Sequence, residues 1–116
     1  MKIHRLYVDS AGESHFQDVE IALTDPSHAG WQSAPVLATG LLFRRAPSDY
    51  DVDWTVAPRR QYIVNLDAGV LLTASDGEAR RIGAGEVILV EDTWGKGHRS
   101  KALGSRARHS IFVMLD

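Results

Sequence analysis

The chain has 116 residues, of which 44% are hydrophobic and 24% charged, a balance typical of one folded domain covering residues 1–116. Its net charge of -2 provides no basic field for nucleic acid or for an anionic membrane surface, so we expect neither as a partner. The absence of cysteine excludes disulfides, thiolate metal sites and cysteine nucleophiles.

Residues 1–9 lack the apolar run and the small-residue cleavage site of a signal peptide. No stretch of the sequence has the length needed to cross a bilayer. We therefore expect a cytoplasmic protein.

Apolar residues alternate or form short runs bounded by Gly, Pro, Asp and Ser, which predicts an all-β fold of the sandwich or barrel kind. The predicted strands are Ile3–Val8, Phe16–Leu23, Val36–Phe43, Tyr62–Leu66, Val70–Ala74, Ala79–Ile82, Val87–Val90 and Ile111–Leu115. The segment Ala46–Pro58 is bracketed by prolines and rich in Asp, and its pattern fits either a loop or an edge strand.

Two turns are well specified by their residues. Asp76-Gly77 tolerates positive φ and predicts a hairpin between Val70–Ala74 and Ala79–Ile82. Gly83-Ala84-Gly85 then predicts a tight corner leading into the strand Val87–Val90.

The order of these features resembles the small single-domain cupins. Within residues 59–100 the chain has Leu66-Asp67-Ala68-Gly69, then Asp76-Gly77, then Gly83-Ala84-Gly85-Glu86, and finally a hydrophobic strand followed by His98. The segment 91–98 (EDTWGKGH) and the upstream WTVAPRRQ are similar to one subgroup of that family. The resemblance implies a cupin barrel (a double-stranded β-helix, or jelly roll) with an internal cavity. It also favours a homodimer, because an open barrel leaves strand edges exposed.

The resemblance also shows which residues of this chain stand at the positions of the metal ligands of typical cupins. The usual H-x-H falls near Trp54-Thr55-Val56-Ala57, the usual Glu falls at Gln61, and only the last ligand has a counterpart, His98. Thr, Trp and Gln are poor ligands for zinc, iron or manganese, so we expect no metal and no other cofactor. An irregular site stays open as an alternative, in which His98 is joined by members of the set Asp53, Glu91, Asp92, His15 and His28.

Glu91 and Asp92 follow the apolar strand Val87–Val90, which places them at the predicted barrel mouth. Partial burial there would raise a carboxylate pKa toward the range of a general base, with His98 assisting as acid or clamp. The opposing interpretation is an acidic turn that caps the strand end, with His98 in a structural hydrogen bond.

Five further residues are candidates for binding a substrate. Arg60 and Lys96 would hold an anionic group, with Arg59 as the alternative to Arg60, because strand alternation turns only one of the two inward. Gln61 would offer a neutral hydrogen bond in the cavity. Trp54 and Trp94 would form an aromatic wall, although packing in the core or in a dimer interface is the favoured explanation for either tryptophan alone.

The hypothesis that joins these features is a metal-independent enzyme of the isomerase or lyase type, which moves a proton on a small organic molecule. Two alternatives stay open. One is a non-catalytic module that binds a small molecule between Trp54 and Trp94. The other is a metal-dependent cupin dioxygenase with an irregular ligand set.

Overall fold

The computed structural model describes residues 1–116 and contains twelve β-strands and no helix, which confirms the predicted all-β class. The strands are β1 (Lys2–Val8), β2 (Ser14–Glu20), β3 (Asp25–Ser27), β4 (Gly30–Gln32), β5 (Gly40–Ala46), β6 (Asp51–Thr55), β7 (Gln61–Asn65), β8 (Val70–Ala74), β9 (Ala79–Ile82), β10 (Val87–Val90), β11 (His98–Ala102) and β12 (Arg108–Met114). No helix able to cross a membrane is present.

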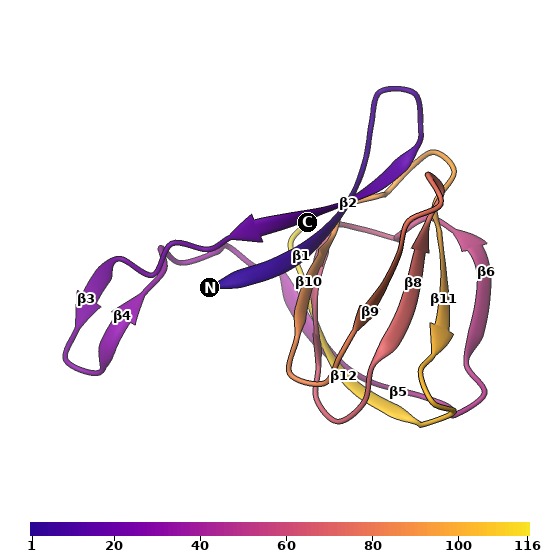
Figure 1. Ribbon diagram of the computed structural model, residues 1–116. Coiled ribbons are helices and arrows are strands. Elements are labelled where there is room, and N and C mark those ends of the chain that lie inside the picture. Colours follow the sequence, from indigo (N-terminus) through magenta and orange to yellow (C-terminus); the bar gives the residue numbers. More distant parts are fainter.

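Two sheets form the body of the molecule (Figure 1). The larger has the strand order β2-β1-β10-β7-β12-β5 and the smaller has the order β6-β11-β8-β9. Neighbouring strands are antiparallel except for β1 and β10, which run parallel. Hydrogen bonding does not join the edges of either sheet, so the expected closed barrel is not formed and the body consists of two open sheets.

The core lies between the two sheets, because alternation along each strand sends every second side chain inward. The buried cluster takes residues from both sheets and from the chain before β7: Leu6, Phe16, Ala57, Val70, Leu72, Ala74, Ile82, Ile88 and Val90. Strand β8 shows the pattern clearly, since its first, third and fifth residues are buried. The apolar alternation of the sequence is thus the physical cause of the face-to-face packing.

The outer faces of the two sheets differ in polarity. The smaller sheet turns Thr73, Arg99 and Lys101 outward, as expected for a face in water. The larger sheet instead carries apolar rows on its outer face, each following the strand register. The first row is Leu41, Val113, Tyr62 and Leu89, and the second is Phe43, Ile111, Val64 and Val87. Phe43 is 77% exposed.

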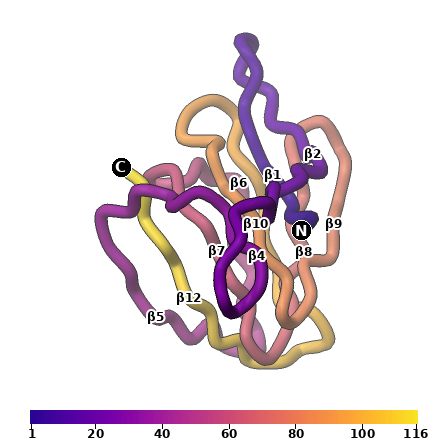
Figure 2. The backbone as a smooth tube through the Cα atoms, turned by 90° about the vertical axis from the view of Figure 1, so that its left-hand side faces the viewer, coloured from indigo at the N-terminus to yellow at the C-terminus, as the bar shows by residue number.

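Residues 21–39, here called the arm, connect β2 to β5, the two edges of the larger sheet. The arm contains only the small hairpin β3–β4, which projects away from the body in Figure 1 and stands in front of the larger sheet in Figure 2. Its Trp31 and Leu37 are 71% and 88% exposed. The predicted strands Phe16–Leu23 and Val36–Phe43 are therefore wrong where they enter the arm, because their apolar residues there have no neighbouring strand.

The remaining strand predictions are correct where the local sequence pattern is clear. Strands β8, β9 and β10 have the predicted bounds, and Gly77 adopts φ 97° in the expected hairpin. The segment 46–58 contains β6, which is an edge strand of the smaller sheet. Strand β11 was not expected, because its residues HRSKA include no apolar run.

Candidate functional site

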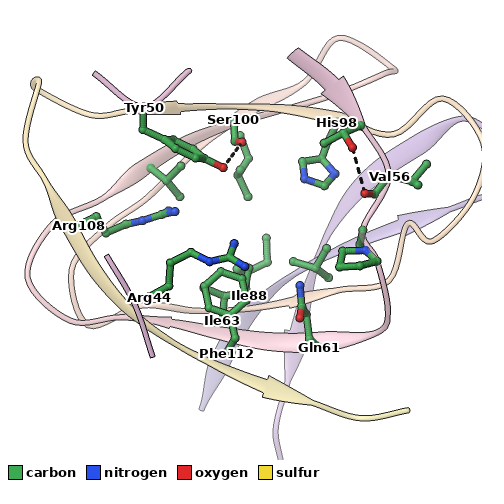
Figure 3. Close-up of a pocket in the computed structure, with 16 residues that line it drawn as sticks. Arg44, Tyr50, Val56, Gln61, Ile63, Ile88, His98, Ser100, Arg108 and Phe112 are labelled. Carbon is green, nitrogen blue, oxygen red and sulfur yellow. Dashed lines mark hydrogen bonds between the residues drawn. The ribbon is translucent and has the colours of Figure 1, made fainter. Parts of the chain in front are cut away.

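A cavity of about 120 Å³ lies between the two sheets, and Figure 3 shows the side chains around it. Its wall is formed by Arg44, Tyr50, Thr55, Val56, Ala57, Pro58, Gln61, Ile63, Val70, Leu72, Ile88, Val90, His98, Ser100, Arg108 and Phe112. The apolar members come mainly from the core positions of β7, β8, β10 and β12. The polar members stand where the same inward positions carry polar residues, as in β11.

His98 is the imidazole of this cavity, and Asp92 holds it in place. The His98 Nδ1 and the Asp92 Oδ2 are 2.5 Å apart, and the Asp92 side chain is fully buried. A carboxylate can only accept a hydrogen bond, so His98 Nδ1 carries the proton and donates it to Asp92. The other ring nitrogen, Nε2, is then left as an acceptor on a ring that projects into the cavity (Figure 3).

The second carboxylate oxygen of Asp92 has an unusual environment. Asp92 Oδ1 is buried without any hydrogen-bond partner, and no other buried side-chain nitrogen or oxygen of the protein shares that condition. Leaving a buried acceptor unpaired costs about 1–3 kcal/mol, so such atoms are rare in native proteins. The fold therefore keeps Asp92 beside His98 at the expense of stability.

Two glycines let the loop between β10 and β11 deliver His98 to this place. Gly95 and Gly97 have φ values of 86° and 74°, a region that strongly favours glycine. A Cβ at residue 97 would collide with the backbone carbonyl of Thr55, and a Cβ at residue 95 would collide with the backbone of Gly12. The Gly-Lys-Gly sequence before His98 is thus required by close backbone contacts on both sides.

The opposite end of the cavity carries two guanidinium groups. Arg44 and Arg108 project inward from the neighbouring strands β5 and β12 (Figure 3). Neither contacts a carboxylate: the Arg44 guanidinium lies 4.1 Å from the centre of the Phe112 ring, and that of Arg108 lies 5.5 Å from the centre of the Tyr50 ring. Tyr50 Oη is also 2.9 Å from Ser100 Oγ.

Three of the predicted site residues meet at the cavity. Asp92 and His98 form the pair described above, and the buried Gln61 points into the cavity from the first position of β7. The sequence interpretation took a carboxylate as the base and His98 as its assistant. The structure favours the opposite roles, with His98 as the base and Asp92 as its assistant, because His98 faces the cavity and Asp92 lies behind it.

Glu91 lies outside the cavity, between two arginines. Its carboxylate oxygens accept hydrogen bonds from Arg5 Nε at 2.5 Å and from Arg60 Nε at 2.7 Å. Burial acts to raise the pKa of Glu91, but the hydrogen bonds and charges of Arg5 and Arg60 outweigh it and hold this pKa below its usual value. The expectation of a raised pKa at Glu91 is therefore wrong.

The other four predicted binding residues do not line the cavity. Arg60 is engaged with Glu91 and Asp116, and Lys96 forms an ion pair with Glu13 at 2.9 Å. Trp54 and Trp94 are both about half exposed on the outside of the molecule. Trp54 faces outward because its neighbour Thr55 takes the inward position on β6.

Four polar residues of the cavity wall were not predicted from the sequence: Arg44, Tyr50, Ser100 and Arg108. The sequence does contain a pattern that indicates such residues, namely polar residues at inward-facing strand positions, for example Arg108-x-Ser110-x-Phe112 on β12. This signal needs the strand register to be interpreted, since the same alternation started one residue later would turn Arg108 to the solvent.

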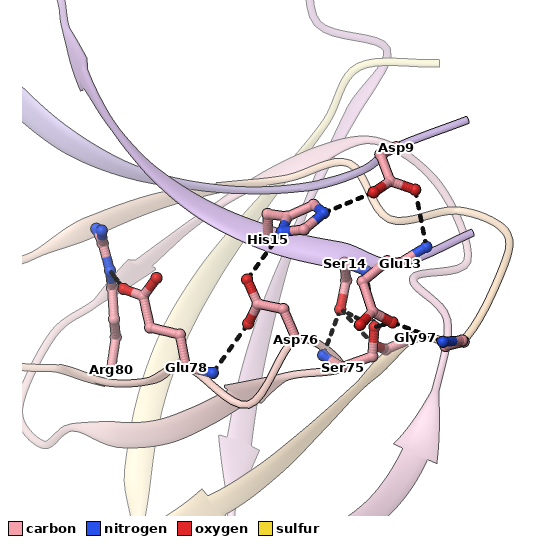
Figure 4. A network of polar contacts seen from close by, with 10 residues as sticks. Asp9, Glu13, Ser14, His15, Ser75, Asp76, Glu78, Arg80 and Gly97 are labelled. Atoms are coloured by element: carbon pink, nitrogen blue, oxygen red, sulfur yellow. Dashed lines mark hydrogen bonds and ion pairs between the residues drawn. The ribbon is translucent and has the colours of Figure 1, made fainter. Parts of the chain in front are cut away.

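The residues present do not fit the metal that the resemblance implies. Thr55, Gln61 and His98 line the cavity at the positions carried over from the cupin motif, and His98 alone offers an imidazole or carboxylate ligand. No group of three or more His, Asp or Glu side chains in the protein is arranged so that it could hold a metal ion. His15, a candidate for an irregular set, lies between Asp9 and Asp76 in a separate polar network (Figure 4).

Comparison with known proteins shows a structural similarity but no sequence relationship to a known family. No protein-family model and no curated protein matches the sequence. Among solved structures, the fold is similar to that in the crystal structure of protein NMB1881 from Neisseria meningitidis, with a TM-score of 0.52 and 16% sequence identity. The likeness covers 66% of this chain and 72% of that chain, and at this identity it concerns the fold alone.

Proposed function

We propose that the protein is a metal-independent enzyme of the isomerase or lyase type, in which His98 moves a proton on a small organic molecule. The observation that carries the proposal is a cavity-facing imidazole held by a fully buried carboxylate. Asp92 selects the tautomer with the proton on Nδ1 and stabilises the imidazolium that forms during the reaction. Glu91 has no part in this proposal, because Arg5 and Arg60 engage both of its oxygens.

The chemistry follows from the free Nε2 of His98. This nitrogen takes the proton of a C–H bond beside a carbonyl group, and the electron pair of that bond moves onto the carbonyl oxygen. In an isomerase the proton then returns to another carbon. In a lyase the electron pair expels a leaving group, which takes the proton from His98. Gln61 and Ser100 offer hydrogen bonds to the oxygen that gains charge.

We also propose that the two sheets form a jelly roll of the cupin kind, although their edges are not joined. Support comes from the motif order along β7 to β11 and from the position of the cavity between the sheets. A cytoplasmic location is also proposed, and a chain without cysteine needs no oxidising compartment for disulfides.

Proton transfer can be tested before the natural substrate is known. Small carbonyl compounds that raise the melting temperature would be incubated with the protein in D₂O, and loss of their C–H signals would be followed by proton NMR. We expect exchange with the wild type and a loss of about 10²–10⁴-fold in His98→Gln. Asp92→Asn should also lose most of the exchange, because the amide favours the wrong tautomer.

The chain offers a matched control. His109 Nδ1 lies 2.6 Å from Asp67 Oδ2 in an exposed pair, so His109→Gln removes the same chemical pair away from the cavity. That variant should exchange like the wild type. Equal rates in His98→Gln and the wild type would overturn the assignment. Binding without any exchange would instead favour the second candidate, a non-catalytic binding module, which the mainly apolar wall also suits.

We also propose that the protein forms a homodimer through the outer face of its larger sheet. Two apolar rows lie uncovered on that face, and the arm that stands in front of it exposes Trp31 and Leu37. The arm has one acidic residue and no Lys or Arg, which suits an apolar protein surface better than a polyanion. A two-fold pairing buries the face and the arm of both copies in one step.

A further inference from the structure

Arg108 is a buried cation without an anion. The residue is 6% exposed, and the half-buried arginines Arg5 and Arg80 of this chain are by contrast paired with carboxylates. Burial lowers the pKa of Arg108, the charge of Arg44 lowers it further, and Tyr50 acts in the opposite direction. A buried charge without a counter-ion is strongly unfavourable, so the arrangement lacks the anion that would balance it.

Arg44 adds a second cation at the same end of the cavity. It extends inward from β5, which pairs with β12 in a register that sets Arg44 opposite Ser110, two residues from Arg108. The Arg44 guanidinium lies over the face of Phe112, so its N–H edges stay free for an acceptor in the plane of the group. Two guanidinium groups that repel each other are thus held together beside an open space.

We propose that Arg44 and Arg108 bind the carboxylate of a small organic acid, whose apolar body lies along Ile63, Leu72 and Ile88 toward His98. This inference rests on the proposed function, since it names the class of molecule that the same cavity takes. The cations stand at one end and the His98 imidazole at the other, so the carboxylate holds the acid while its carbon chain extends toward the imidazole (Figure 3).

The lining of the cavity favours an organic carboxylate over inorganic phosphate. The planar fork of arginine pairs with either anion, but nine of the sixteen lining residues are hydrophobic. An organic acid offers a carboxylate to the two arginines and a carbon chain to this apolar wall, whereas inorganic phosphate leaves the wall without a contact.

The test uses the straight-chain monocarboxylates from acetate to hexanoate, each beside its neutral amide, and inorganic phosphate. Binding is measured by calorimetry and by the shift of the melting temperature. We expect at least one acid to bind while its amide does not, with affinity falling about ten- to hundredfold in Arg44→Gln and in Arg108→Gln. Arg45→Gln is the matched control, because Arg45 is the next residue on β5 and faces outward.

Several outcomes would overturn the proposal. They are the absence of binding by every acid, equal binding of acid and amide, unchanged affinity in Arg44→Gln, or tighter binding of phosphate with the same dependence on both arginines. Arg44 is an exposed residue, so Arg44→Gln keeps the test valid if Arg108→Gln does not fold.

The His98→Gln variant separates this proposal from the proposed enzyme activity. Acid binding that persists in His98→Gln, but is lost in Arg44→Gln, supports the carboxylate site even if no proton exchange is ever seen. Conversely, proton exchange on keto acids that is lost in His98→Gln, but is unaffected by Arg44→Gln, would support the enzyme and overturn the carboxylate site.

Discussion

At the scale of single residues, the cavity contains groups that oppose folding. Arg108 is buried without a carboxylate, and Asp92 Oδ1 is buried without a hydrogen bond. An unpaired buried charge and an unpaired buried acceptor both lower the free energy of unfolding. Such residues are expected at sites where binding, rather than stability, has determined the side chain.

Arg108→Met should therefore stabilise the protein. The substitution keeps the long apolar stem against Tyr50 and removes a buried charge, so we expect the free energy of unfolding to rise by about 1–3 kcal/mol. Urea unfolding of the two proteins measures the difference. Arg45→Met, at an exposed position, should change it by less than about 0.5 kcal/mol. A clear loss of stability in Arg108→Met would show that the guanidinium supports the fold.

His15 gives a prediction about pH. Hydrogen bonds to Asp9 and then Asp76 raise the pKa of His15, against a smaller opposing effect of burial (Figure 4). A pKa raised by folding means that the protonated ring stabilises the native state. This contribution is complete below the unfolded pKa of about 6.5 and is lost as the pH rises through the folded value.

The expected result is that His15→Gln weakens the protein more at pH 5.5 than at pH 9. Unfolding by urea at both pH values, compared with the wild type, gives the two differences. His28→Gln is the control, because His28 is exposed in the arm, and we expect it to change the free energy of unfolding by less than about 0.5 kcal/mol. Equal losses for His15→Gln at both pH values would contradict the role given to Asp9 and Asp76.

At the scale of elements, the glycine-containing loop before β11 determines where His98 lies. Gly97→Ala should destabilise the protein by about 3 kcal/mol or more, because a Cβ there adds a backbone collision at Thr55 to the strain of a positive φ. Gly77→Ala shares the positive φ but meets no atom within 4 Å, so it should lose only about 1 kcal/mol. Denaturant unfolding compares them, and equal losses would refute the close contact.

The sequence predicted the strands that have a clear local pattern of residues. It did not predict the strands that form because of residues distant in the chain. Alternation and turn residues located β8, β9 and β10. Strand β11 forms because it lies between β6 and β8, and its polar residues His98 and Ser100 face the cavity. Asp92 and His98 could be predicted as site residues because a local sequence motif contains both. Arg44 and Arg108 could not, since their meeting depends on the β5–β12 register.

At the scale of the whole molecule, the contrast between the two outer faces leads to a prediction about assembly. Phe43→Lys places a charge at the highly exposed β5 end of the second apolar row and should convert the proposed dimer into a monomer. Sedimentation velocity measures the change. Thr73→Lys, on the polar outer face of the smaller sheet, should stay dimeric. A wild type that is monomeric at every concentration would refute the proposed dimer.

The arm has a consequence for how the polypeptide is held together. It runs from one edge strand of the larger sheet to the other and adds no strand to either sheet of the body. A break in its backbone would leave a short piece carrying β1 and β2 and a long piece carrying everything else. The two would still be joined by the parallel ladder between β1 and β10 and by Leu6 and Phe16 in the core. Covalent continuity through residues 21–39 is thus dispensable for the fold of the body, and new chain termini can be placed there.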